Sequence, residues 1–557
     1  MVRGAFLKQK LLENSTSTKK RNSYFVKGTN QKPEKCKKRR MKYTAVPVDY
    51  TSLLPEPLLH KILSYLTAKD AARCCVLSKR WKELRDSCPV AEFDQRYFVR
   101  SSNAVFQNFV DKFFERRLEQ KCDIQIFKLA VASADSKLAP HIDRWLDIAV
   151  KHNVREIAVH MQERQVRAPY RMPTSVLSAK TLNAITLHRC RLEVPDGINL
   201  PYLTKLCLKH IKLTSQSLQK LISSCPLIES LSLISCKGLV NLEVSNLDRL
   251  NRVEVHFCKG IQKVEIVSST LESFWYYGYT FPQICAINLL GCPSLKKLTL
   301  EDPFMNDLSF ESLIFNFPYL EHLVLSKCNA MTELKISQTQ LKSLILRGCK
   351  NLVKVGIHAP QLVSFEYNGG GSMLFSSLNP SSLRKAKLTF EAVESGFLSR
   401  CLFVAMLHIF LSNFDHSSGL KLVMRHKKKV AIYQHWNNIS LPKLQNMRFE
   451  VIKPSTKLED LLEHLLGTYH PEILSLVTCE GWKKKMLDKV INHIDQNGEL
   501  NCCTYYTKKC WRHYLHASRV EHFTSPVCND SELNDWVTSV KSHSELQSTT
   551  VSLAWQF

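Results

Sequence analysis

A short apolar pattern recurs along nearly half of this 557-residue chain and limits the folds that are open to it. The pattern is apolar-x-x-apolar-x-apolar, and each copy begins 21 to 28 residues after the previous one. Its twelve copies begin at Ile126, Val154, Leu182, Leu203, Ile228, Leu250, Leu271, Leu295, Leu320, Leu341, Leu362 and Leu383. This period predicts a stack of similar units that bury their apolar faces against one another, in place of a single globular core.

Each copy predicts one short strand whose three apolar residues face the interior, while the residues between them face outward. Three residues after the last apolar position, five copies carry a cysteine, namely Cys190, Cys236, Cys258, Cys328 and Cys349. Leucine-rich repeats have Asn or Cys at this position, where the side chain turns inward below the strand. We therefore expect these cysteines to be structural, with no catalytic or metal-binding role.

A second apolar triplet follows the first by eleven residues in several copies. These segments are Leu239–Val244, Ile261–Ile266, Met331–Ile336 and Leu352–Ile357. They predict short extended segments on the outer side of the array. The copies that begin at Ile126 and Val154 are the longest, so we expect helices there, one of them at Ile142–Val150.

The net charge of +27 is unevenly spread. Residues 1–50 hold fourteen Lys or Arg, three Asp or Glu and few apolar residues, so we expect disorder over 1–45. In this tail Lys37, Lys38, Arg39 and Arg40 form a basic cluster. The cluster predicts either a nuclear localisation signal or a solvated tail, and we expect the chain in the nucleus, the cytoplasm or both.

The cysteine content and the length of the apolar runs limit the cellular compartments in which we expect the protein. The first residues form no apolar leader, so the twenty cysteines are expected to be reduced thiols of the cytosol or nucleus. The longest apolar run, Cys401–Leu411, is too short to cross a bilayer, which takes about twenty residues. It predicts a buried helix, and we expect no membrane association.

Residues 50–90 predict a compact unit of three short helices. The first begins at Leu54-Pro55-Glu56, because Pro suits the first helical turn. Its apolar stripe consists of Leu58, Leu59, Ile62, Leu63 and Leu66 at helical spacing. A unit of about forty residues buries little surface by itself, so it leaves an apolar face for a partner.

Residues 49–88 resemble the F-box. The matching residues are Leu54-Pro55, Ile62-Leu63-Ser64, Leu66, Asp70 and Ser78-Lys79-Arg80-Trp81. The F-box followed by cysteine-bearing leucine-rich repeats resembles the large plant F-box/LRR families. Residues 441–523 are similar to the FBD segment of those families, especially Cys510-Trp511-Arg512-His513-Tyr514-Leu515.

The resemblance implies an α/β fold, in which a short three-helix F-box is followed by a curved leucine-rich-repeat solenoid. The predicted order is a disordered basic tail at 1–45, the F-box at 46–95, a helical linker at 96–123, leucine-rich repeats at 124–390, a helical connector at 391–440, an FBD-like solenoid end at 441–523 and a tail at 524–557.

The F-box resemblance implies binding to a Skp-type adaptor, which links the chain to a cullin and a RING subunit. The residues implied to form the adaptor surface or the core beneath it are Leu54, Pro55, Leu58, Ile62, Leu63, Leu66, Val76 and Trp81. The chain would then hold a protein substrate for ubiquitination, perform no bond chemistry and need no cofactor.

The repeat face is the expected place for that substrate. The outward positions include Glu254, His256, Trp275, Tyr277 and Arg347. Exposed aromatic side chains on a concave surface are typical binding anchors. The alternative is that a neighbouring loop shields Trp275 and Tyr277.

The sequence leaves three other interpretations to consider. The chain has no G-x-x-x-x-G-K-[ST], G-x-S-x-G or H-E-x-x-H motif, which argues against an enzyme. Cys502, Cys503, Cys510, His513 and His516 lack the two tight pairs of a structural zinc site, so no metal is expected. Nucleic-acid binding has only the basic tail in its favour, and a repeat scaffold without a ligase role is the third alternative.

Overall fold

The computed structural model describes residues 54–66, 68–98, 103–120, 123–132, 138–162, 169–279, 284–370, 374–378, 383–391, 420–426, 444–451, 470–478, 514–523 and 547–555. The chain divides into two compact units, Met1–Val176 and Leu177–Phe557. The division falls inside the region 124–390 that was predicted as repeats. The predicted tail 1–45, with its basic cluster, and the predicted helix at 401–411 lie outside the described residues.

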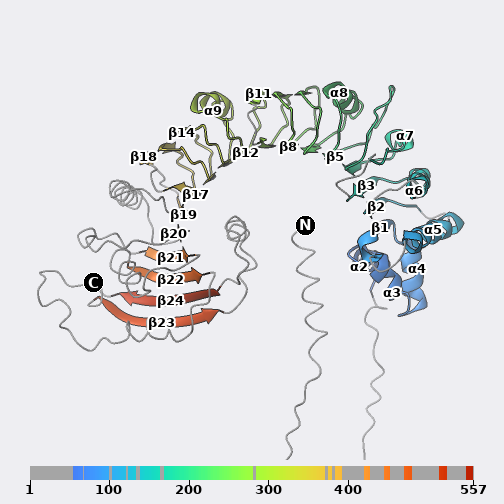
Figure 1. Ribbon diagram of the computed structural model, residues 1–557, viewed down its shortest axis with the longest axis horizontal. Helices are drawn as coiled ribbons and strands as arrows, with labels where there is room; N and C mark the ends of the chain where they lie inside the picture. The colour runs from blue at the N-terminus through green and yellow to red at the C-terminus, as the bar shows by residue number, and fades with distance from the viewer. Residues whose placement is uncertain are drawn as a thin grey trace, which may run out of the picture. The chain divides into compact units, whose positions relative to one another are not determined.

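The first unit begins with three helices and continues with parallel strands that alternate with helices (Figure 1). Its elements are α2 (Glu56–Ser64), α3 (Ala68–Cys74), α4 (Lys79–Ser87), β1 (Val90–Asp94), η2 (Gln95–Phe98), α5 (Asn103–Gln120), β2 (Ile126–Val131), α6 (Ala139–Lys151), β3 (Glu156–Met161) and α7 (Thr174–Leu177), which reaches the boundary. Strand β2 pairs in parallel with both β1 and β3. The helix predicted at Ile142–Val150 is confirmed as part of α6.

The repeats begin earlier than the sequence pattern indicated. Cys88, Ala91 and Phe93 have the triplet spacing and are buried, and they place β1 directly after the third helix. This copy was missed because Cys and Ala are weak apolar signals. The next triplet was assigned to Ile126, Leu129 and Val131, which is a shifted register. Ile126 is only half-buried, and the pairing of Phe127 with Ile157 and of Leu129 with Val159 makes Ile124, Phe127 and Leu129 the triplet of this repeat. Val131 is also buried.

The second unit is built on a long series of parallel strands. In order these are β4 (Ala184–His188), β5 (Lys205–Lys209), β6 (Ser230–Ile234), β8 (Arg252–His256), β10 (Ser273–Tyr277), β12 (Lys297–Glu301), β13 (His322–Ser326), β15 (Ser343–Arg347), β17 (Ser364–Gly370), β19 (Lys385–Glu391), β20 (Leu420–His426), β21 (Leu444–Val451) and β22 (Pro471–Thr478). Each strand pairs with the next in parallel. Every predicted triplet from Leu182 to Leu388 is buried, so the predicted α/β repeat solenoid is confirmed.

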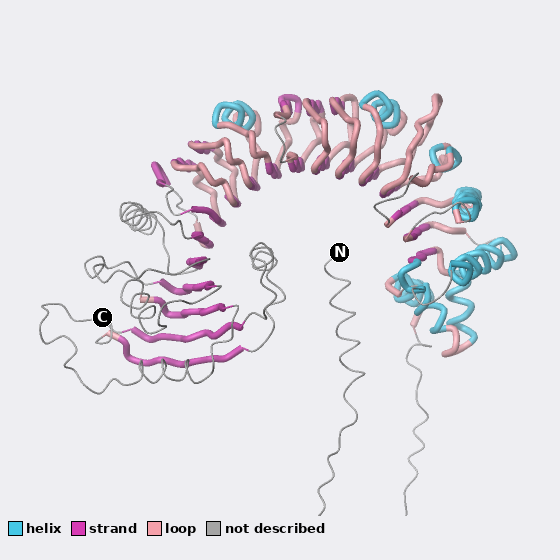
Figure 2. Tube along the Cα trace, in the orientation of Figure 1, coloured by secondary structure: helices cyan, strands magenta, loops and turns pink. Residues whose placement is uncertain are grey.

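The other side of the second unit carries shorter elements. Two three-stranded sheets form there, one from β7 (Asn241–Val244), β9 (Lys263–Val267) and β11 (Ala286–Gly291), and one from β14 (Glu333–Ser337), β16 (Lys354–His358) and β18 (Leu374–Leu378). They confirm the extended segments predicted from the second triplet. Helices α8 (Ser215–Ser223) and α9 (Asp307–Ile314) lie on the same side, opposite the inner strands β5 to β17 (Figure 2).

The end of the chain differs from the predicted tail at 524–557. Gln547–Trp555 forms strand β24, which pairs antiparallel with β22. Strand β23 (Leu515–Phe523) pairs antiparallel with β24. The strand nearest the C-terminus therefore lies between β22 and β23, where Leu553 is buried. Polar residues dominate the preceding segment, and they concealed this strand in the sequence.

The turn after each inner strand is the same in most repeats. One residue adopts a left-handed backbone conformation, as at Arg189, Ser235, Phe257 and Lys327, and its N–H donates to the next repeat. The residue that follows is the inward cysteine. The thiols of Cys236, Cys258, Cys328 and Cys349 each donate to a strand carbonyl of the preceding repeat. The predicted structural position of the cysteines is therefore confirmed.

Gly238→Ala is expected to lower the free energy of unfolding by about 1–2 kcal/mol. Gly238 has a φ of +87°, and a Cβ there would lie 2.9 Å from the carbonyl oxygen of Leu213. Gly197→Ala is the matched control, since its φ is +77° but nothing lies within 4 Å of the added Cβ. Urea unfolding followed by circular dichroism should show the larger loss for Gly238→Ala. Equal losses would mean that the approach to Leu213 has no energetic effect.

Stability is expected to fall above about pH 9 because of buried thiols. Burial raises the pKa of Cys190 and of Cys225 to about 12, from an ordinary value of 9.0. Above the ordinary value the unfolded chain releases these protons while the folded chain keeps them, so the free energy of unfolding falls by about 1.4 kcal/mol per pH unit for each thiol. Unfolding at about pH 8 and about pH 10 measures this. Cys190→Ala with Cys225→Ala should show a smaller fall, and an unchanged fall contradicts the assignment.

Candidate functional site

The first three helices share one small apolar core. It consists of Leu59, Leu63, Ala71, Trp81, Leu84 and Cys88. Helix α4 begins at its N-cap Ser78, whose hydroxyl accepts a hydrogen bond from the Trp81 N–H at 3.3 Å. Arg80 Nη2 donates to the Leu54 carbonyl at 2.7 Å and ties the start of the segment to α4. The core therefore fixes which apolar side chains of these helices remain outside.

Five large apolar side chains of this unit are exposed to solvent, two on α2 and three in the turns that follow α2 and α3. Their exposed fractions are 49% for Leu58, 39% for Ile62, 64% for Tyr65, 89% for Val76 and 68% for Leu77. We call these five residues the apolar face. Exposed side chains of this size in one small helical unit are typical of a protein–protein interface, because nothing in the fold gains from leaving them in water.

The eight residues predicted to serve adaptor binding differ in how deeply they are buried. Pro55, Leu58, Ile62 and Val76 are exposed, Leu63 and Trp81 belong to the core, and Leu54 and Leu66 pack against that core while half-buried. Their roles toward an adaptor stay predictions. Tyr65 and Leu77 were not in the predicted set. Tyr65 follows Leu58 and Ile62 at helical spacing, and Leu77 follows the apolar residues Cys75 and Val76, so the sequence held a signal for both.

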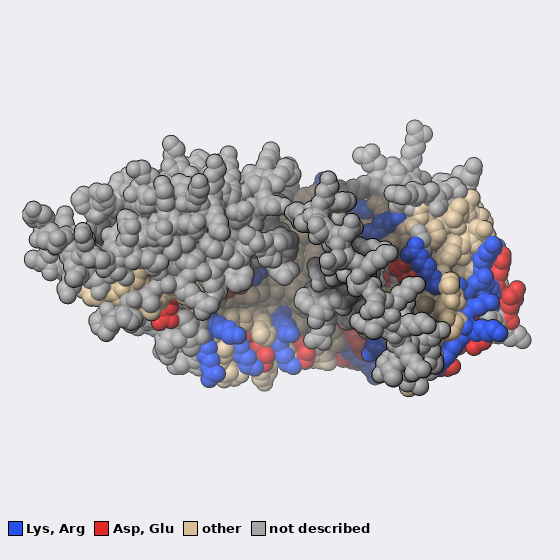
Figure 3. All heavy atoms as spheres, turned by 90° about the horizontal axis from the view of Figure 1, so that it is seen from below, with Lys and Arg blue, Asp and Glu red and all other residues tan. Residues whose placement is uncertain are grey.

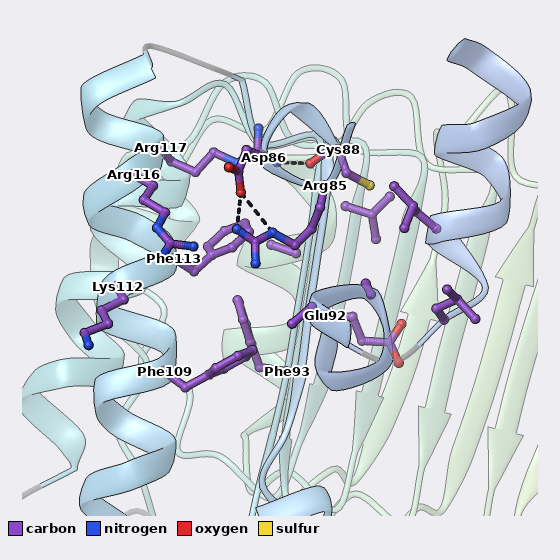
Figure 4. A pocket seen from close by; sticks show the side chains of 16 residues that line it. Arg85, Asp86, Cys88, Glu92, Phe93, Phe109, Lys112, Phe113, Arg116 and Arg117 are labelled. Atoms are coloured by element: carbon purple, nitrogen blue, oxygen red, sulfur yellow. Dashed lines mark hydrogen bonds and ion pairs between the residues drawn. The ribbon is translucent and has the colours of Figure 1, made fainter. Parts of the chain in front are cut away.

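A pocket of about 230 Å³ lies behind the three helices, between them, β1 and α5 (Figure 4). Its lining includes no member of the apolar face. Its lining includes three aromatic residues and four basic ones, namely Phe93, Phe109, Phe113, Arg85, Lys112, Arg116 and Arg117. Sequence reasoning did not find this pocket, because α5 was expected only as a linker.

The charged groups of the pocket are held by local contacts. Arg85 Nε donates to Asp86 Oδ1 at 2.9 Å. The Arg117 side chain is buried, its Nη2 donates to the Cys88 carbonyl, and its guanidinium carbon lies 5.2 Å from the Phe113 ring centroid. These contacts connect α5 to the end of α4, so they support the position of the helices that carry the apolar face.

The predicted substrate residues of β8 and β10 lie side by side on the inner strands. The parallel register places Trp275 beside Glu254 and Tyr277 beside His256. The guanidinium carbon of Arg252 lies 4.2 Å from the Trp275 ring centroid, and Arg252 Nε donates to Glu254 Oε1 at 2.9 Å. Ser232 donates to the other Glu254 oxygen at 2.8 Å. These contacts hold the indole and the carboxylate in fixed orientations.

Burial and hydrogen bonds shift the titration of this group. Burial raises the pKa of Glu254, but hydrogen bonds from Arg252 and Ser232 outweigh it, so the pKa lies below its ordinary value. Burial lowers the pKa of His256. The face therefore presents a carboxylate and a neutral imidazole at neutral pH.

Trp275 and Tyr277 are both half-buried, and side chains of adjacent strands account for part of this burial. The rings of His256 and Tyr277 meet edge to face, with centroids 4.3 Å apart. Arg347, the fifth predicted residue, lies three strands further along on β15, where it donates to Glu366 at 3.2 Å. The structure thus brings four of the five residues together. A role in substrate binding stays a prediction for all five.

Other predictions concern residues with no structural description. Lys37, Lys38, Arg39 and Arg40 lie outside the described residues, as do Cys502, Cys503, Cys510 and His513, whereas His516 belongs to strand β23. Within the described ranges, no three His, Cys, Asp or Glu side chains gather in a way that could hold a metal ion. None of the described helices is long and apolar enough to cross a membrane. On the face in Figure 3, described Lys and Arg side chains are interspersed with Asp and Glu.

Comparison with family models supports the two-part organisation. The F-box domain model matches residues 51–90. The LRR domain model of At1g61320/AtMIF1 matches residues 118–289 and 282–409, which together exceed half of the chain.

Relatives in Arabidopsis thaliana agree with these matches. F-box/FBD/LRR-repeat protein At1g78750 is 30% identical over 278 residues, which are 47% of this chain and 56% of that protein. F-box/FBD/LRR-repeat protein At5g53840 is 27% identical over 402 residues, which are 65% of this chain and 85% of that protein. The FBD-associated F-box protein At5g53635 is 31% identical over 214 residues, 38% of this chain and 49% of that protein, so the match spans about half the length of some of these relatives. These matches agree with the three N-terminal helices and with the repeats that carry inward cysteines. The chain therefore belongs to the F-box/LRR-repeat family.

Proposed function

We propose that this chain is the substrate-recognition subunit of a Skp–cullin–F-box ubiquitin ligase. The apolar face of the F-box carries the proposal. Leu58, Ile62, Tyr65, Val76 and Leu77 are exposed on a unit whose own core is already complete. A Skp-type adaptor would cover them, and the adaptor would connect the chain to a cullin and a RING subunit.

The repeats would hold the protein substrate. The inner strands present a rigid face on which Arg252 stacks on Trp275 and His256 contacts Tyr277. Aromatic and arginine side chains are the most frequent anchors of protein interfaces, and here neighbouring strands preorganise them. The chain would act by position, since holding a substrate close to a ubiquitin-charged enzyme raises its effective concentration there.

Capture from living cells tests this proposal. The full chain, carrying an affinity tag, is expressed in plant cells in which the proteasome is blocked. The adaptor, the cullin and a set of ubiquitin-modified proteins are expected to copurify with it. A variant with Leu58→Asp and Val76→Asp should keep the substrates, lose the adaptor and leave the substrates unmodified. Recovery of the substrates with full ubiquitination from this variant would contradict the proposal.

A further inference from the structure

Four basic residues lie in register at one rim of the second unit, in four successive repeats. Each comes one residue after the inward position of its repeat, and backbone bridges pair Arg191 with Lys212, Lys212 with Lys237, and Lys237 with Lys259, all in parallel. Neighbouring strands lie about 4.8 Å apart, so the row is roughly 14 Å long. All four residues are exposed. We call them the basic row.

The backbone beneath the basic row is fixed. The Lys237 N–H donates to the Ile211 carbonyl at 2.9 Å, and the Leu213 N–H donates to the Lys237 carbonyl at 3.0 Å. Gly238 and Gly260 follow Lys237 and Lys259 with positive φ, so the chain turns away directly after each cation. The backbone positions of the four residues are therefore fixed, while their long aliphatic side chains remain free to change conformation.

The basic row differs from several other lysines of the repeats in its lack of counter-ions. Lys220, Lys296, Lys327 and Lys342 each lie within 3 Å of a carboxylate oxygen on a neighbouring repeat. In the basic row only Arg191 has an ion pair, with Glu193 at 2.9 Å. Lys212, Lys237 and Lys259 form no ion pair with any described residue.

Like charges opposite one another in adjacent strands destabilise a sheet. The fold therefore gains nothing from four cations in register, and their charge is available to a ligand. Asn329 occupies the same position after Cys328, three repeats beyond Cys258, so the turn itself needs no positive charge. The turn can thus form without a basic residue at this position.

We propose that the basic row binds an acidic segment of a protein partner, which lies across the strands along the rim. Alternate side chains of an extended peptide are roughly 6.6 Å apart, so three acidic residues on one side of the peptide span about the length of the row. Flexible lysine stems absorb the difference in spacing. A nucleic acid needs a broad basic footprint. The basic row occupies one position in each of four repeats, and Glu193 pairs with Arg191 beside it.

This inference names the chemistry of the captured partner and rests on the proposed receptor function. It concerns only the second unit, so it can be tested without an adaptor. Failure of acidic-peptide binding would leave docking to the adaptor untouched, and failure of adaptor binding would leave the basic row in place.

The test measures binding of a fluorescein-labelled octaglutamate peptide to the full chain at low ionic strength. Lys212→Gln, Lys237→Gln and Lys259→Gln are combined in one variant. Each exposed ion pair contributes a factor of roughly two to five in affinity, so the combined variant is expected to bind about tenfold more weakly. Octaglutamine is the uncharged probe and should not bind either protein.

The matched control combines Lys205→Gln, Lys297→Gln and Lys385→Gln, which are exposed lysines on inner strands and remove the same charge. It should bind octaglutamate within about twofold of the wild type. Equal losses in both variants would show general attraction to a basic protein and overturn the proposal. Loss of oligothymidine binding with unchanged octaglutamate binding would assign the row to nucleic acid and overturn it as well.

Discussion

Replacing Leu58 and Val76 together by Asp is expected to weaken binding of the full chain to a Skp-type adaptor about a hundredfold or more. Both side chains belong to the apolar face, at 49% and 89% exposure, so neither supports the core of the F-box. A buried interface would have to desolvate both carboxylates, and central interface residues typically contribute about 2 kcal/mol or more each. Isothermal titration with purified adaptor measures the change.

Leu118→Asp is the matched control for this pair. Leu118 is 45% exposed on α5, outside the three F-box helices, and the change introduces the same group. Adaptor affinity should stay within about twofold of the wild type. Circular dichroism should show the same melting temperature for all variants, because no substituted residue is part of the core. Equal weakening by Leu118→Asp would place the adaptor elsewhere.

Trp145→Ala is expected to lower the free energy of unfolding of the first unit by about 3–5 kcal/mol. The Trp145 side chain is fully buried, and its ring meets Phe106 edge to face with centroids 6.2 Å apart. Its Nε1 donates to Asp111 Oδ1 at 2.7 Å, which joins α6 to α5. The substitution opens a cavity and removes a hydrogen bond to a carboxylate. Urea unfolding followed by tyrosine and tryptophan fluorescence measures the loss.

Trp145→Phe separates the two contributions. It keeps most of the packing and removes only the donor to Asp111, so a loss of about 1–3 kcal/mol is expected. A loss as large as that of Trp145→Ala would assign the whole effect to the hydrogen bond. No loss in either variant would contradict the packing described for α5 and α6.

Much of the fold could be predicted because the same apolar triplet recurs in many repeats. From Leu182 to Leu388, each triplet buries three apolar residues, and each inward cysteine is a small group that fits below a strand. Single triplets carry little information, but their common period defines both the strands and their parallel order. The short outer segments followed from the same argument.

The failures have physical causes. The first repeat uses Cys88 and Ala91, whose side chains bury little area, so its triplet does not stand out. In the next repeat both Ile126 and Ile124 fit a triplet, and only packing decides between them. Strand β24 pairs with β22 and β23, and partners that are distant in the sequence leave no local signal.

The candidate site was predictable only in part. Strand alternation placed Trp275 and Tyr277 on the outward face, and the repeat period placed them beside Glu254 and His256. The sequence pattern could not show that Arg252 stacks on Trp275, because the orientation of a side chain depends on its neighbours in space. Burial likewise separated Val76 from Trp81 within the F-box, where both matched the family pattern.

The central claim is that the apolar face of the F-box docks a Skp-type adaptor. Titration of the full wild-type chain with purified adaptor tests it most directly. The account predicts saturable one-to-one binding with a Kd of about 1 μM or tighter, as expected for an interface of standard size. Absence of measurable binding at adaptor concentrations well above that value, with a folded chain, would contradict it.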